Sequence, residues 1–291
     1  MHPPRASRGL PALATLVALA AVSVIVAVLG ASPPAVGATE ALGAARSPGE
    51  PAFVASHRGG AAHAPENTLP AVSRAFDDGF DYVEVDVALT RDRVPVLLHD
   101  QTVDRTTDGA GELASLSWAD VSALDAGAWF SPAYAGTRVP RVEEFLDLVA
   151  ERNGRAIVEL KGPWDGEAAA ALVSAIEQRG LERSITVASF DARTLALVGS
   201  ASPVLSRMVV LRALPDDVVH AASLAGVRGV IASRRAVAER PEVVAQLHEA
   251  GLRIAVYTLN SDEQWREATS LGVDGIITDD PTGLFRWQQD A

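Results

Sequence analysis

The chain has 291 residues, 48% of them hydrophobic, so it can bury a large core; it has no cysteine, which excludes disulfides and thiolate metal sites. Its formal net charge of −12 argues against a nucleic-acid-binding protein, because such proteins normally carry a basic surface stripe. Any anionic substrate must therefore be attracted by positive charge that is local to its binding site.

The first 38 residues have the pattern of a secretory signal. Their only charges are Arg5 and Arg8, residues 10–30 are apolar, and residues 36–38 (VGA) suit signal cleavage. We expect a cleaved signal peptide; a retained membrane anchor is the alternative, because the apolar run is long enough to span a bilayer. In both cases the folded domain is expected outside the cytoplasm, either secreted or anchored to the membrane. Residues 39–50 are expected to be a short disordered linker.

From residue 51 to residue 291, short apolar runs alternate with helical patterns. Parallel strands are expected at 52–56, 82–87, 156–160, 185–189, 204–210, 228–232, 253–258 and 275–278. Helical patterns lie between them, for example at 167–179, 241–250 and 262–271. Eight such units predict an α/β fold in the form of a closed (β/α)₈ TIM barrel.

One further strand breaks this alternation. Residues 94–98 follow the second strand too closely for a parallel crossover, which needs a dozen or more residues. They must therefore return antiparallel, as a hairpin with its turn at residues 90–93. This hairpin brings His99 alongside Glu84 and Asp86 of the second strand.

The stretch 100–140 is a second departure from the βα pattern. It is rich in Gly, Ser, Asp and Trp, and it precedes the third barrel strand. We interpret it as an ordered insertion of about 40 residues that covers the mouth of the barrel. A short helix is expected at 117–124, with Trp118 and Trp129 as packing anchors.

Glu84 and Asp86 predict a metal site. Side chains two apart in a strand point the same way, and the flanking Val and Tyr residues favour burial. Buried like charges repel each other and are costly to desolvate, and a divalent cation removes both costs. Carboxylate oxygens favour Ca²⁺ or Mg²⁺. The alternative is an edge strand with two solvated acids.

Active groups of such barrels gather at the C-terminal ends of the strands. His57 and Arg58 follow the first strand, and Glu159 and Lys161, the only lysine of the chain, end the third. Imidazole titrates near neutral pH, so His57 and His99 are the expected acid and base pair. The histidines that lack acidic neighbours at strand ends are expected to have no role; they are His63, His220 and His248.

An ordered set of motifs accompanies these residues. It comprises His57-Arg58-Gly59, Pro65-Glu66-Asn67-Thr68, Glu84-x-Asp86-Val87, Thr90-x-Asp92, His99-Asp100 and Arg105-Thr106-Thr107. Each motif alone is weak, but the whole set in this order and spacing resembles the glycerophosphodiester phosphodiesterases. Weaker similarity continues to residues 279–281, which match the family's closing motif and are expected to be structural.

The resemblance implies a metal-dependent phosphodiesterase that releases glycerol 3-phosphate and an alcohol from small glycerophosphodiesters. It implies one divalent cation, Ca²⁺ or Mg²⁺, and a nucleophile that is either water or the glycerol 2-hydroxyl. The membrane would be contacted only through an uncleaved N-terminal segment. The implied metal ligands are Glu84, Asp86 and Glu159, and the implied substrate-binding residues are Arg58, Lys161, Phe190 and Tyr257.

Residues 66–68 are expected to support the site rather than to bind the metal. Glu66 is expected to hold other site residues in place, and Asn67 or Thr68 to cap the first helix. Two alternative functions stay open from sequence alone. One is a phospholipase D-like enzyme of the same superfamily, acting on sphingolipid or lysophospholipid head groups. The other is a secreted binding protein on a degenerate barrel, although none of the implied ligands or histidines is missing.

Overall fold

The computed structural model describes residues 42–290. The expected signal segment lies outside these residues. Within them, no helix combines the length and the apolar character that crossing a membrane requires.

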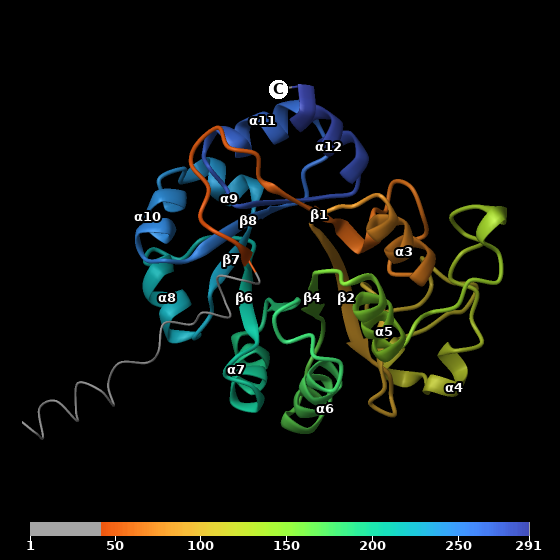
Figure 1. The fold of residues 1–291 in the computed structure, drawn as a ribbon. Coiled ribbons are helices and arrows are strands. Elements are labelled where there is room, and N and C mark those ends of the chain that lie inside the picture. Colours follow the sequence, from red (N-terminus) through yellow and green to blue (C-terminus); the bar gives the residue numbers. More distant parts are fainter. Residues whose placement is uncertain (1–41, 291) are drawn as a thin grey trace, which may run out of the picture. The chain divides into compact units, whose positions relative to one another are not determined.

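Eight parallel strands form a closed barrel, as the sequence predicts. Each strand pairs with its neighbours, and β1 pairs with both β9 and β2, which closes the ring (Figure 1). The barrel strands are β1 (Phe53–Ser56), β2 (Tyr82–Leu89), β4 (Ala156–Leu160), β5 (Ile185–Ser189), β6 (Ser206–Leu211), β7 (Gly229–Ser233), β8 (Arg253–Tyr257) and β9 (Gly275–Thr278).

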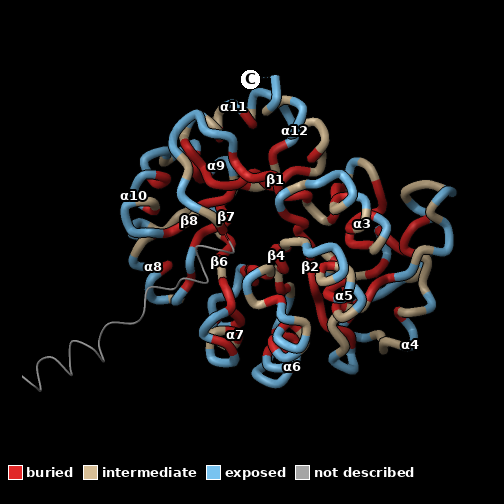
Figure 2. Tube along the Cα trace, viewed as in Figure 1, coloured by how far each residue is buried: buried red, intermediate tan, exposed pale blue. Residues whose placement is uncertain are grey.

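Helices surround the barrel on its outside. Buried residues concentrate in the strands, and exposed residues lie on the outer faces of the helices (Figure 2). The helices that follow or precede barrel strands are α3 (Leu69–Asp77), α5 (Val142–Arg152), α6 (Gly166–Glu177), α7 (Ala192–Ala201), α8 (Val218–Leu224), α9 (Arg234–Glu239), α10 (Val243–Glu249), α11 (Asp262–Ser270) and α12 (Pro281–Asp290).

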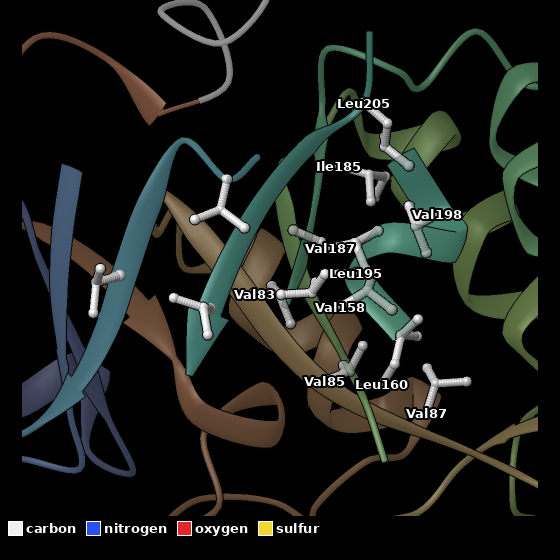
Figure 3. Packing of buried hydrophobic residues seen from close by; sticks show 14 of the residues in the cluster. Val83, Val85, Val87, Val158, Leu160, Ile185, Val187, Leu195, Val198 and Leu205 are labelled. Atoms are coloured by element: carbon white, nitrogen blue, oxygen red, sulfur yellow. The ribbon is translucent and has the colours of Figure 1, made fainter. Parts of the chain in front are cut away.

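The alternation of side chains along β2 determines what faces the barrel interior. Val83, Val85 and Val87 belong to the cluster between the strands and the helices (Figure 3). Tyr82 belongs to the separate cluster that fills the barrel interior. Because neighbouring residues of a strand point to opposite faces, Glu84 and Asp86 share the interior face with Tyr82. Strand parity therefore places both carboxylates inside the barrel.

The expected hairpin is present. Strand β3 (Pro95–Leu97) pairs antiparallel with β2, with Val87 opposite Leu97. The Leu98 N–H donates to the Asp86 carbonyl at 3.1 Å, which holds the start of the next segment against the carboxylate-bearing part of β2. The chain therefore leaves the hairpin beside the site, where His99 follows directly.

Residues 98–141, here called the β3–α5 segment, build a small core of their own beside the barrel. This core includes Val103, Leu113, Val121 and Val139. The segment contains the short helices η2 (Leu113–Ser115), α4 (Trp118–Val121) and η3 (Pro132–Tyr134). Trp118 packs against its core as expected, but Trp129 is 40% exposed, so the expectation that Trp129 is a packing anchor was wrong.

The described part of the expected linker is held against the barrel rather than disordered. Leu42 is only 2% exposed and packs in the cluster that fills the barrel interior. The backbone N–H of Arg46 donates to Asp274 Oδ1 at 2.9 Å, and Arg253 Nε donates to the Gly43 carbonyl at 3.0 Å. These contacts come from residues more than 200 positions away, so local composition gives no sign of them.

Replacing Leu42 by alanine should lower the free energy of unfolding by about 2–4 kcal/mol, because it leaves a cavity among buried side chains. Leu224→Ala is the matched control, since Leu224 is 76% exposed. Urea denaturation of both variants measures the difference. Equal stability of the two variants would show that Leu42 does not contribute to the barrel core.

Candidate active site

A tight turn at the end of β1 places His57 and Arg58. The 3₁₀ helix η1 (His57–Gly59) directly follows the strand, and Arg58 has the left-handed backbone angle φ 53°. A Cβ at Gly59 would lie 2.8 Å from Ala71 Cβ, so only glycine allows α3 to pack this closely. The Arg58 N–H donates to Glu84 Oε2 at 2.9 Å, which fixes the turn to the carboxylates of β2.

Three carboxylates meet inside this end of the barrel. Asp86 of β2 is paired in register with Glu159 of β4, and Glu84 lies two residues before Asp86. One oxygen from each of these side chains lies within 4.8 Å of the other two. The structure therefore brings together the three acids that the resemblance implied as metal ligands.

The charges of these acids fit a divalent cation. Burial and the neighbouring Asp86 raise the pKa of Glu84 to about 8. Burial would also raise the pKa of Asp86, but Lys161 and Arg58 outweigh it and lower that pKa. Burial and the charge of Asp86 raise the pKa of Glu159. A cation with a preference for hard oxygen ligands would relieve this repulsion, so the group can hold a metal ion.

Asn67 supports Asp86 rather than capping a helix. Its Nδ2 donates to Asp86 Oδ2 at 2.9 Å, and its Oδ1 accepts from the Asp86 N–H at 3.0 Å. Thr68 is the N-cap of α3. Asn67 has φ 56°, a left-handed conformation that Asn tolerates better than most residues. The sequence expectation left the cap open between these two residues, and the pairing with Asp86 is new.

Two cations lie against the carboxylates. Lys161 Nζ is 2.6 Å from Glu159 Oε1 and 3.2 Å from Asp86 Oδ1. Arg58 Nε is 3.3 Å from Asp86 Oδ2, and its Nη1 donates to Glu66 Oε1 at 2.7 Å. Both side chains are mostly buried, so Lys161 is not a surface lysine. They supply the local positive charge that an acidic chain needs to admit an anion.

His57 is oriented by Asp279, which the sequence analysis expected to be merely structural. His57 Nδ1 lies 2.5 Å from Asp279 Oδ1, and Asn260 Nδ2 donates to Asp279 Oδ2 at 2.7 Å. Burial would lower the pKa of His57, but the hydrogen bond to Asp279 and the nearby charge of Glu84 raise it. Asp279 thus contacts a candidate site residue, a position that its sequence context did not predict.

His99 is oriented in the same way by the residue after it. Its Nδ1 lies 2.7 Å from Asp100 Oδ1, and Arg105 Nε donates to Asp100 Oδ2 at 2.6 Å. The hydrogen bond from Arg105 holds the pKa of Asp100 at about 2. Arg105 also donates both terminal nitrogens to Glu66 at 2.8 Å. Glu66 therefore bridges Arg58 and Arg105 and lies outside the carboxylate group, in the supporting position expected for it.

A signal that could have identified Asp279 is present in the sequence. Ile277 of β9 belongs to the cluster in the barrel interior. Asp279 follows it by two residues, so strand alternation predicts that both side chains point to the same face. Strand parity relates Ile157 of β4 to Glu159 in the same way. Polar residues two positions after an interior apolar residue at a strand end are thus candidates for the site.

Two of the histidines that were expected to lack an acidic neighbour lie against a carboxylate. His63 Nε2 lies 2.8 Å from Asp280 Oδ1, and His248 Nε2 lies 2.9 Å from Asp274 Oδ2, so that expectation was wrong for both. Neither pair belongs to the carboxylate group of the site. His220 is exposed on α8, and no described residue pairs with its ring.

Two adjoining cavities open from His99 and Lys161. One, of about 300 Å³, lies beside the β2–β3 hairpin and is lined by Leu89 and Leu113. The other, of about 750 Å³, is lined by Phe190 and by Arg212. The β3–α5 segment contributes to the walls of both, since His99, Asp100 and Gln101 line each of them. A bound phosphodiester has two substituents, and the two cavities offer a place for each.

Phe190 and Tyr257, the two expected pocket aromatics, pack against each other. Their ring centroids are 6.3 Å apart at an interplanar angle of 85°, an edge-to-face contact. Phe190 lines the larger cavity and is 37% exposed. The Tyr257 hydroxyl donates to the Leu211 carbonyl at 3.4 Å, at the end of β6. Phe190 therefore faces the space for substrate, and Tyr257 supports it.

Replacing Asp279 by asparagine should reduce kcat roughly 10- to 100-fold, because the carboxylate that orients His57 is lost. Asp280→Asn is the matched control one residue away, because Asp280 pairs with His63 instead. The kcat and its pH profile are measured for both variants. Equal kcat values and profiles would show that Asp279 does not orient a working His57.

Comparisons with known proteins identify the family to which the chain is similar. The sequence model of the glycerophosphoryl diester phosphodiesterase family matches residues 57–282. A glycerophosphodiester phosphodiesterase of Caldanaerobacter subterraneus subsp. tengcongensis is 31% identical over 238 residues, covering 80% of this chain and 96% of that protein. One from Bacillus altitudinis is 31% identical over 236 residues, covering 78% of this chain and 94% of that protein. The crystal structure of the enzyme from Agrobacterium tumefaciens superposes with a TM-score of 0.69 at 30% identity, covering 80% of this chain and 98% of that one.

Proposed function

The chain belongs to the glycerophosphoryl diester phosphodiesterase family and is a phosphoric diester hydrolase, and we propose that it acts as a metal-dependent enzyme releasing glycerol 3-phosphate and an alcohol. One observation carries the proposal. Glu84, Asp86 and Glu159 meet at the barrel mouth near two histidines that each have an acidic partner on Nδ1. Three oxygen donors at this spacing suit one divalent cation, Ca²⁺ or Mg²⁺.

A divalent cation held by these three carboxylates would supply positive charge for the phosphoryl oxygens and could lower the pKa of an oxygen nucleophile. Lys161 and Arg58 add positive charge next to the same carboxylates. Three carboxylates and one divalent cation leave a formal charge of −1, which would repel a phosphodiester. The ammonium and the guanidinium offset that charge and can hold the non-bridging phosphate oxygens.

The two histidines act as the proton acceptor and the proton donor of the reaction. In both rings the acidic partner occupies Nδ1, and no described residue hydrogen-bonds to either Nε2. A proton on Nδ1 fixes the tautomer, so Nε2 can take up or deliver a proton at the substrate. One histidine accepts the proton of the attacking hydroxyl, from water or from the glycerol 2-hydroxyl. The other protonates the oxygen of the leaving alcohol, which is a poor leaving group as an alkoxide.

We also propose that the enzyme is exported. The support is the sequence of residues 1–38, with its two arginines, its uncharged apolar run and its small residues before a cleavage point. Cleavage after Ala38 would keep Leu42, whose side chain packs in the barrel interior. The mature N-terminal sequence of protein recovered from the culture medium tests this proposal.

The activity is tested by incubating the purified protein with glycerophosphocholine and Mg²⁺ or Ca²⁺ and identifying the products by ³¹P NMR. Glycerol 3-phosphate and free choline are expected. Sphingomyelin and a lysophospholipid are run in parallel, because the wider superfamily includes enzymes for such head groups. Cleavage of those lipids without cleavage of glycerophosphocholine would contradict the proposal.

A further inference from the structure

Asn260 holds Asp279 at two points. It lies in the connection between β8 and α11, and Asp279 directly follows β9. Asn260 Nδ2 donates to Asp279 Oδ2 at 2.7 Å, and Asn260 Oδ1 accepts from the Asp279 N–H at 2.9 Å. The same Oδ1 accepts from the Thr278 hydroxyl at 3.1 Å. Just before these contacts, the Leu259 N–H donates to the Ile277 carbonyl at 3.0 Å, which ties the two connections together.

The orientation of the Asn260 amide follows from its partners. A backbone N–H can only donate, so the atom that faces the Asp279 N–H must be the amide oxygen. The amide nitrogen then donates to Asp279 Oδ2. Burial would raise the pKa of Asp279, but the hydrogen bonds from His57 and Asn260 lower it, so the acceptor is a carboxylate. Oδ1 of that carboxylate is left for His57 Nδ1, at 2.5 Å.

The same arrangement occurs at a second carboxylate of the site. Asn67 Nδ2 donates to Asp86 Oδ2 at 2.9 Å, and Asn67 Oδ1 accepts from the Asp86 N–H at 3.0 Å. In both pairs one asparagine engages the main chain and the side chain of one aspartate. An amide bound at both points restricts rotation of the carboxylate. Asn67 and Asn260 are far apart in the sequence, so no shared local motif produces the two clamps.

Asn260 fixes Asp279 without neutralising its charge. Asp100, the corresponding acid at the second histidine, is bound by the guanidinium of Arg105 at 2.6 Å. An amide carries no charge. Within residues 42–290, His57 is the only basic side chain at ion-pair distance from Asp279. The negative charge of Asp279 is therefore directed at the imidazole of His57.

We propose that Asn260 is a positioning residue for His57 and acts through Asp279. It holds Oδ2 of the carboxylate so that Oδ1 stays aligned with Nδ1 of the imidazole. This alignment keeps the proton on Nδ1 and leaves Nε2 for the substrate. The inference rests on the proposed function for its effect on turnover. Its effect on the imidazole proton is a property of the protein without substrate.

Two substitutions separate hydrogen bonding from side-chain shape. Asn260→Ala removes the amide and lets water reach Asp279 Oδ2, since Asn260 is exposed. Asn260→Asp keeps the shape but places a second carboxylate against Asp279, and like charges this close repel. With glycerophosphocholine and Mg²⁺ or Ca²⁺, kcat should fall roughly 5- to 20-fold in Asn260→Ala and further in Asn260→Asp, with KM changed less than about twofold. A residue that only packs would give the opposite order, because Asn260→Asp preserves the shape.

Gln264→Ala is the matched control for the connection. Gln264 Oε1 accepts from the Asn260 N–H at 2.8 Å, so this substitution disturbs the same loop and leaves the amide on Asp279 in place. Its kcat should equal that of the wild type. Equal losses in Gln264→Ala and Asn260→Ala, or higher activity in Asn260→Asp than in Asn260→Ala, would overturn the inference.

The proton on His57 is measured independently of turnover. Ring ¹⁵N chemical shifts are recorded without substrate at a pH above the pKa of His57, and the signals are assigned by comparison with His57→Ala. The wild type should carry the proton on Nδ1, and Asn260→Ala should show a larger share of the Nε2–H tautomer. An unchanged tautomer in Asn260→Ala would overturn the inference in an active enzyme as well. A tautomer shift in a protein that releases no glycerol 3-phosphate would support the inference and contradict the proposed function.

Discussion

Replacing His99 or His57 by alanine is expected to lower kcat/KM for glycerophosphocholine by roughly 10²–10⁴-fold in each variant. Each imidazole has its Nδ1 occupied by a carboxylate, Asp100 or Asp279, and so presents Nε2 for proton transfer. Alanine removes that proton carrier. Neither ring lies in the apolar clusters that hold the barrel together, so the fold should persist. Initial rates of glycerol 3-phosphate release measure the effect.

The matched control for these variants is His220→Ala, which removes an exposed imidazole on α8. Its activity should equal that of the wild type, and circular dichroism should show a folded protein in all three variants. Wild-type activity in either His57→Ala or His99→Ala would contradict the proposed acid and base pair.

Replacing Glu159 by glutamine is expected to weaken binding of the divalent cation by more than about 100-fold, because even residues that only support a metal ligand contribute roughly 10–100-fold. Glu159 is the most accessible of the three acids, with a side chain 14% exposed, so this substitution disturbs the fold least. Turnover should fall with metal occupancy. Isothermal titration calorimetry of metal-stripped protein with Mg²⁺ and with Ca²⁺ measures the affinity.

Glu263→Gln is the control for this substitution, because Glu263 is an exposed acid at the start of α11. Metal should also raise the unfolding temperature of the wild type, since a ligand that binds only the folded state stabilises it. That increase should be absent in Glu159→Gln. Equal metal affinity in Glu159→Gln and Glu263→Gln would contradict the assignment of Glu159 as a ligand.

Strand alternation made most of the fold and the core of the site predictable from the sequence. Each barrel strand is short, apolar and separated from the next by a helical pattern, so the eight units could be located individually. The i, i+2 spacing of Glu84 and Asp86 fixes their common face through backbone geometry alone. The short connection before residues 94–98 forces a hairpin, and the hairpin places His99. Local rules were sufficient for all these features.

Contacts between distant parts of the chain were not predictable in this way. His57 and Asp279 are 222 residues apart in sequence, and their pairing exists only because β9 closes the barrel beside β1. Asn67 is a residue type that is common at helix N-caps. Its side chain instead bonds to Asp86, because the segment between β1 and α3 packs on β2. Leu42 lies within a stretch that has a linker-like composition, and its side chain is buried in the barrel core, which composition alone does not indicate.

The proposed mechanism depends on a cation held by Glu84, Asp86 and Glu159 during cleavage of the phosphodiester. The most direct measurement is glycerol 3-phosphate release from glycerophosphocholine by protein stripped with a chelator, before and after Mg²⁺ or Ca²⁺ is added back. No release is expected from the stripped protein, and full recovery is expected on addition of one of the two ions. Undiminished release from protein whose measured metal content is far below one ion per chain would contradict the proposed mechanism.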